Sequence, residues 1–92
     1  MRSNLSDLPS GPVLPLDQMR GGETGEIIDV RGGRGVVRRL TEIGLAPGTR
    51  VRMVSGAGRS GPLIVNVGDA KIGLGRGMAR RVLVRQSAQG SP

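Results

Sequence analysis

The chain contains no cysteine, histidine, phenylalanine, tyrosine or tryptophan, and these absences exclude several classes of function. Without cysteine there is no disulfide and no thiolate chemistry. Histidine and cysteine are also the usual ligands of zinc and ferrous iron, and the four methionines are soft ligands spread widely along the chain. We therefore expect no bound metal and no cofactor.

The seven aspartate and glutamate residues are scattered singly, so the sequence offers no clear acid–base pair. Glu23 and Glu26 come nearest to one, but their spacing across the start of an expected strand is typical of solvated surface. We expect no catalytic residue, no enzymatic activity and no small-molecule substrate.

The lack of aromatic residues leaves the packing of this 92-residue chain to aliphatic side chains. A single domain of this size buries about 60 to 65% of its unfolded surface, so its core is thin. No segment approaches the ~20 consecutive apolar residues that a membrane helix needs. The N-terminal segment, interrupted by Pro9, Pro12 and Pro15, also lacks the apolar region of a signal peptide. We expect a soluble, cytoplasmic protein with no direct membrane insertion.

Basic residues outnumber acidic ones, giving a formal net charge of +7, and every basic side chain except Lys71 is an arginine. Residues 1–18 hold one basic and two acidic residues, whereas residues 19–85 hold thirteen basic and five acidic residues. A basic surface attracts nucleic acid, acidic lipid or an acidic protein face equally well. The charge therefore indicates a class of partner rather than one partner.

Alternating apolar residues between the two ends of the chain predict five short strands. The ends themselves are rich in proline, serine and glycine, a composition typical of disorder. Short strands with glycine-rich connections favour a small, strongly bent barrel that closes to protect its edges. The expected strands are residues 24–30, 49–54, 62–67, 70–74 and 81–85. The expected core is Ile28, Val30, Leu40, Ile43, Leu45, Val51, Met53, Leu63, Val65, Val67, Ile72, Leu74, Val82 and Val84.

One segment, residues 35–44, has helical rather than strand periodicity, because Val36, Leu40 and Ile43 recur on one side. Gly44 follows, where a helix end favours a residue with positive φ. Pro47 and Gly48 then predict a turn into the next strand. Residues 75–78 predict a single helical turn before the last strand.

Two features of the sequence, a glycine-rich segment and the excess of basic residues, suggest anion binding, and each is weak evidence for it. Residues 29–37 run from strand through a glycine-rich loop to a helix, the order of a phosphate cradle, but they lack the Lys-Ser/Thr of a P-loop and favour a simple turn. Basic small barrels also bind nucleic acid, but single-strand readers stack bases on aromatic rings, each worth roughly 1–3 kcal/mol, and this chain has none. Non-specific phosphate contact stays open, although nucleic acid is the less favoured partner.

Three motifs, in order, resemble the ferrous iron transport protein A (FeoA) family. They are Arg-Leu-x-x-x-Gly-Leu-x-Pro-Gly at 39–48, Gly-Pro-Leu at 61–63 and Ile-x-Leu-x-x-x-x-Ala at 72–79. The resemblance implies an all-β, SH3-like β-barrel with one short α-helix and a helical turn before the last strand. The resemblance covers an FeoA-like domain at residues 14–85. The composition of the two ends predicts a disordered leader at 1–13 and a disordered tail at 86–92.

The resemblance also implies a non-catalytic accessory protein of ferrous iron uptake, whose partner is an FeoB-type membrane transporter with a GTP-binding cytoplasmic domain. Related SH3-like domains occur in iron-dependent repressors, so a regulatory interaction domain is the alternative. Arg38, Arg39 and Glu42 lie on the outer side of the expected helix, where the barrel does not need them. With Arg76, they are the candidate partner-binding residues.

Overall fold

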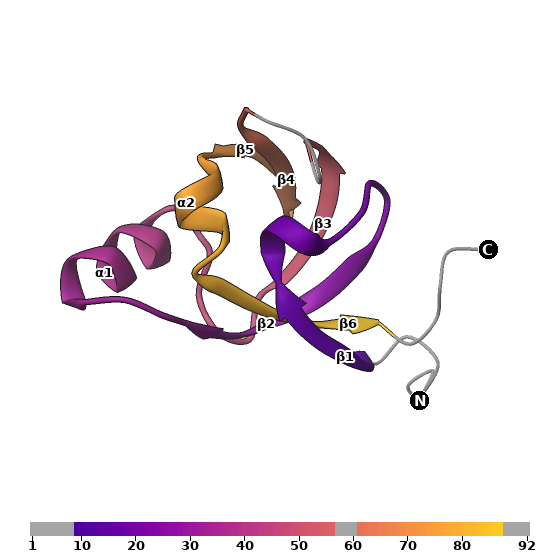
Figure 1. Ribbon diagram of the computed structural model, residues 1–92, viewed down its shortest axis with the longest axis horizontal. Helices are drawn as coiled ribbons and strands as arrows, with labels where there is room; N and C mark the ends of the chain where they lie inside the picture. Colours follow the sequence, from indigo (N-terminus) through magenta and orange to yellow (C-terminus); the bar gives the residue numbers. More distant parts are fainter. Residues whose placement is uncertain (1–8, 57–60, 88–92) are drawn as a thin grey trace.

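The structure, a computed structural model, describes residues 9–56 and 61–87, which form a strongly curved antiparallel sheet with short helices (Figure 1). The strand order is β1-β6-β2-β3-β4-β5, and every adjacent pair is antiparallel. The strands are β1 (Pro9–Pro15), β2 (Thr24–Val30), β3 (Arg50–Ser55), β4 (Leu63–Val67), β5 (Ala70–Leu74) and β6 (Val82–Ser87). The helical segments are η2 (Leu16–Gln18), α1 (Arg34–Glu42) and α2 (Arg76–Ala79).

The proline-rich composition predicts a disordered leader ending at residue 13 and does not predict the strand β1. The structure corrects this over residues 9–13, which belong to β1 and pair with β6. Proline lacks a backbone N–H, but a strand at the edge of a sheet needs a partner on one side only. Residues 1–8 of the expected leader and 88–92 of the expected tail lie outside the described residues, and residues 86 and 87 belong to β6.

The sheet is open rather than closed, which corrects the expectation of a closed barrel. Within residues 9–56 and 61–87, no pairing joins the two outer strands, β1 and β5. The segments that follow these strands, η2 and α2, contact each other instead. Short helical segments thus approach across the side where the sheet does not close, and they help to shield its edges.

A β-bulge in β2 decides which of its isoleucines enters the core. The register between β2 and β6 shifts between Ile27 and Asp29, so Ile28 is the extra residue. Strict alternation would have placed Ile28 and Val30 on one face. Instead Ile27 and Val30 are buried while Ile28 is 38% exposed, and the prediction of Ile28 in the core is wrong.

The other expected core residues of the strands are buried or pack against the core, Val67 and Ile72 being partly buried. The core also contains apolar side chains that the periodicity did not identify, from η2, from the segment after it and from α2. These additional residues are Leu16, Met19 and Ala79. An aliphatic core is thus completed by short helical segments at the open side of the sheet.

The passage from α1 to β3 follows the predicted geometry. Gly44 has φ +103°, its N–H donates to the Thr41 carbonyl at 3.0 Å, and the Leu45 N–H donates to the Leu40 carbonyl at 2.8 Å. This pair of bonds is a Schellman motif, accompanied by burial of both leucines. Gly48, with φ +94°, precedes a Thr49 N–H that donates to the Ala46 carbonyl at 3.1 Å, which makes the predicted turn a type II turn.

We expect Gly44→Val to lower the free energy of unfolding by more than about 1 kcal/mol, because a β-branched residue is strained at positive φ. Gly35→Ala is the matched control, since a β-carbon at this position in α1 would meet nothing within 4 Å. It should leave stability unchanged or raise it by up to ~1 kcal/mol. Urea denaturation measures both, and equal destabilisation by the two variants would contradict the role given to Gly44.

Candidate protein-interaction surface

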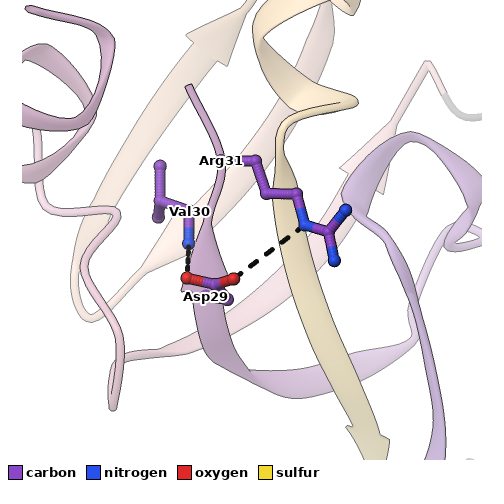
Figure 2. A network of polar contacts seen from close by, with 3 residues as sticks. All are labelled: Asp29, Val30 and Arg31. Atoms are coloured by element: carbon purple, nitrogen blue, oxygen red, sulfur yellow. Dashed lines mark hydrogen bonds and ion pairs between the residues drawn. The ribbon is translucent and has the colours of Figure 1, made fainter. Parts of the chain in front are cut away.

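The end of β2 places α1 at one end of the molecule (Figure 1). Figure 2 shows the Asp29 carboxylate there: Oδ1 accepts a hydrogen bond from the Val30 N–H at 2.9 Å, and Oδ2 lies 3.9 Å from the Arg31 Nε. Both charged side chains are more than half exposed, so this ion pair adds little stability. The Arg31 N–H also donates to the Arg81 carbonyl at 2.8 Å, which extends the contact between β2 and β6 to the start of the α1 loop.

The loop before α1 contains a glycine at a position where a side chain would crowd the helix. Gly32 has φ +135°, and a β-carbon added there would lie 3.0 Å from Cγ1 of Val36. Val36 and Val37 pack against the core, and Leu40 is fully buried. The loop therefore lets the apolar side of α1 approach the sheet, as the simple-turn interpretation predicted.

The opposite side of α1 is exposed and basic. Arg34, Arg38, Arg39 and Glu42 are all exposed, and in the part of the chain that the structure describes no hydrogen bond or ion pair engages their side chains. Ile43, expected in the core, is instead 40% exposed at the end of the helix, and that prediction is wrong. We call these five residues the α1 surface.

Arg34 occupies an electrostatically unfavourable position at the start of α1. Arg34 stands in the first turn of the helix, where the partial positive charge of the helix dipole repels a cation, and that turn contains no acidic residue. Arg34 and Arg38 are also four residues apart, a spacing at which like charges repel. An acidic surface placed against α1 would remove both penalties.

Arg76, the fourth candidate, lies in α2 and forms a hydrogen bond within the chain. Its Nη2 donates to the Gly56 carbonyl at 2.8 Å, and its Nε is buried without a hydrogen-bond partner in the described residues. Gly56 has φ +100° and follows the end of β3. The structure therefore places Arg38, Arg39 and Glu42 together on α1 and sets Arg76 apart. The separation of twenty positions between Arg76 and Gly56 explains why sequence spacing gave no sign of this bond.

Glu23 and Glu26 do not form a shared acidic site. Glu23 Oε1 accepts a hydrogen bond from the Arg20 N–H at 2.8 Å and so closes the turn before β2. Glu26 lies opposite Arg50 on β3 and Arg85 on β6. Among the described residues, no group of three or more Asp, Glu, His or Cys side chains is placed to hold a metal ion. No helix in the same residues is long and apolar enough to cross a membrane.

We expect Arg76→Ala to lower the free energy of unfolding by about 1–2 kcal/mol, since it removes a charged hydrogen-bond donor from a partly buried site. Arg38→Ala, which removes the same charge from an exposed site, should change stability by less than ~0.5 kcal/mol. Urea denaturation of the two variants tests the difference. Equal effects would show that the bond between Arg76 and Gly56 does not stabilise the fold.

We also expect no stoichiometric binding of Fe(II) tighter than about tens of micromolar, because scattered surface carboxylates bind divalent ions weakly. Anaerobic calorimetry of the purified protein measures this affinity. A one-site isotherm at lower Fe(II) concentration would contradict the prediction.

Comparison with known proteins identifies the domain. A family model described as the FeoA domain matches residues 14–86. A Methanocaldococcus jannaschii protein, provisionally named Fe(2+) transport protein A, is 26% identical over 78 residues, covering 85% of this chain and 93% of that protein.

Solved structures agree with this match. The crystal structure of an iron uptake regulatory protein (FeoA) superposes with a TM-score of 0.77 and 33% identity, covering 82% of this chain and 99% of that one. Stenotrophomonas maltophilia FeoA complexed with zinc, described as a prokaryotic SH3 domain protein, gives a TM-score of 0.68 and 29% identity over 82% and 96% of the two chains. A manganese-dependent transcriptional repressor shares the fold, with a TM-score of 0.74 at 24% identity, over 85% of this chain and 44% of its own length.

The expected SH3-like fold is thus confirmed. A family model that covers most of the chain, together with structural relatives of matching length, shows that the chain belongs to the FeoA domain family of iron transport proteins.

Proposed function

We propose that the protein is a non-catalytic, cytoplasmic accessory protein of ferrous iron uptake that binds the cytoplasmic GTP-binding domain of an FeoB-type transporter. Membership of an iron transport family supports the process. The absence of histidine and cysteine from the sequence supports action by contact rather than by chemistry on iron. The α1 surface is the proposed contact.

The observation that carries the proposal is the division of α1 into two sides. Val36, Val37 and Leu40 face the core, so the fold needs only that side of the helix. The other side presents three arginines without partners in the described part of the chain, in a helix that has no acid in its first turn. Such a side gains free energy when it meets an acidic face.

The exposed Ile43 gives the α1 surface an apolar component beside its charges. Protein interfaces combine a desolvated apolar centre with a polar rim, and the area burial makes part of their affinity independent of salt. Binding to phosphate backbones lacks this component, because it depends mainly on the release of counterions. The composition of the α1 surface therefore favours a protein partner over nucleic acid.

The test is a pair of binding titrations, one with the transporter's cytoplasmic domain and one with a mixed-sequence oligonucleotide, across about 50 to 200 mM salt. We expect the domain to bind throughout this range, and the oligonucleotide to lose its affinity at physiological salt. The variant Arg38→Ala/Arg39→Ala should weaken binding to the domain about 3- to 30-fold through loss of two rim charges.

The matched control is Lys71→Ala/Arg80→Ala, which removes the same charge from exposed positions outside α1. It should change the affinity for the domain little. Equal weakening by both double variants would mean general charge attraction and would overturn the assignment to α1. Tight, strongly salt-dependent oligonucleotide binding without affinity for the domain would favour the nucleic-acid function instead.

A further inference from the structure

A concave surface, separate from the α1 surface, lies on the outer face of the sheet. It is a pocket of about 420 Å³ formed where β6, β2, β3 and β4 lie side by side. Pockets of this size accommodate small organic ligands. The side chains and turn that line it include Thr24, Arg50, Arg52, Asn66, Gly68 and Ser87.

The strand registers bring the polar groups of the pocket into one row. Arg52 on β3 lies opposite Thr24 on β2 and opposite Asn66 on β4. The Thr24 hydroxyl donates to the Ser87 hydroxyl on β6 at 3.1 Å. Since neighbouring strands are about 4.8 Å apart, Arg52 and its two neighbours, Thr24 and Asn66, lie within about 10 Å, the reach of one small ligand.

The alternation of β3 directs its arginines outward. Val51 and Met53 are buried in the core, so Arg50 and Arg52 project from the opposite face, about 7 Å apart along the strand. Gly68 begins the two-residue turn between β4 and β5 with φ +61°, which fits a type II′ turn. A β-carbon there would meet nothing within 4 Å, so the pocket is open on this side.

The pocket is positively charged and partly unsatisfied. Its lining contains two arginines and no carboxylate. Arg50 lies opposite Glu26 and already has an interaction within the chain, so Arg52 carries the unused guanidinium. In the part of the chain that the structure describes, no hydrogen bond or ion pair engages the side chains of Arg52 or Asn66. A planar guanidinium binds two oxygens of an oxyanion at once, and the Ser87 hydroxyl and the Asn66 amide can donate to the remaining oxygens.

We propose that this pocket binds the phosphate monoester group of a small molecule. A monoester carries a charge of about −1.5 to −2 at neutral pH and three acceptor oxygens, which suits the guanidinium of Arg52, the positive charge of Arg50 beside it and the neutral donors of Ser87 and Asn66. A carboxylate or a phosphodiester carries a single negative charge and matches less well. The volume exceeds that of a bare phosphate and leaves room for the organic part of the ligand.

The pocket and the α1 surface are independent, because they share no residue and lie on different elements. Failure of phosphate binding would therefore leave the proposed transporter contact intact, and the reverse also holds.

Amide NMR spectra of the ¹⁵N-labelled full chain test the proposal, with inorganic phosphate, phenyl phosphate and dimethyl phosphate as probes at constant ionic strength. We expect saturable shifts centred on Thr24, Arg52 and the Asn66 side-chain amide, with dissociation constants of about 0.1–1 mM for the monoester. Inorganic phosphate should bind about 3-fold more weakly, because it does not fill the pocket. The diester should bind about 10-fold more weakly, because it has one charge.

Two variants and a control locate the site. Arg52→Gln should weaken phenyl phosphate binding about 10-fold, whereas Arg80→Gln, an equal change of charge at an exposed position in another part of the chain, should have little effect. Thr24→Val keeps the β-branched shape that suits a strand and removes only the hydroxyl, so it should weaken binding about 3-fold with the spectrum of the fold preserved.

Three results would overturn the proposal. They are shifts that rise linearly and spread over arginines throughout the chain, equal loss of affinity in Arg52→Gln and Arg80→Gln, and equal affinity for the monoester and the diester. Tighter binding of inorganic phosphate than of phenyl phosphate would indicate that the ligand is free phosphate. It would contradict the proposal that the pocket binds an organic phosphate monoester.

Discussion

The pairing of β2 with β6 is the contact on which the rest of the structure depends. Both strands have a neighbour on each side, and the bulge at Ile28 turns both Ile27 and Val30 into the core. At one end of this pairing, the bond from Arg31 to Arg81 fixes the start of the α1 loop. At the other end, the bond from Thr24 to Ser87 forms one side of the phosphate pocket. One antiparallel ladder thus positions both surfaces to which function is assigned here.

Because the core has no aromatic residues, the stability of this fold depends more on that strand pairing than it does in a protein with a larger core. Aliphatic side chains lack the area and the specific geometry with which an aromatic ring fixes its neighbours. The chain compensates by closing its open side with Leu16, Met19 and Ala79 from short segments between strands. Backbone hydrogen bonds and dense aliphatic packing, rather than a few large side chains, hold the fold together.

The arginines of this protein fall into separate roles, although they look alike in the sequence. Arg76 is tied to a backbone carbonyl, and Arg31 pairs with an exposed carboxylate. Arg38 and Arg52 have no partner in the described part of the chain, and they lie on two different surfaces. The SH3-like fold also occurs in a manganese-dependent repressor, so the fold alone does not select a function. The positions of the unpaired arginines on that fold indicate which surfaces bind a partner or a ligand.

The sequence by itself determined the strands β2 to β6, α1, the turn at Pro47–Gly48 and the positive φ of Gly44, because local periodicity and glycine chemistry control these features. Its motifs also identified the family. Composition concealed β1, because prolines that suggest disorder are tolerated at a sheet edge once β6 supplies a partner. Periodicity misplaced Ile28, because a bulge is a property of two paired strands and leaves no mark in one of them.

The candidate site was likewise predictable from the sequence in part only. Helical spacing was enough to gather Arg38, Arg39 and Glu42 on the outer side of α1, since neighbours on one helix are fixed by local geometry. Only the tertiary structure separated Arg76 from them, through a bond to a carbonyl twenty residues away. Likewise, only the strand registers brought Thr24, Arg52, Asn66 and Ser87 together, because these residues come from four strands far apart in the chain. Long-range pairing, which no local pattern encodes, decides which charged side chains are used within the fold and which remain available to a partner or ligand.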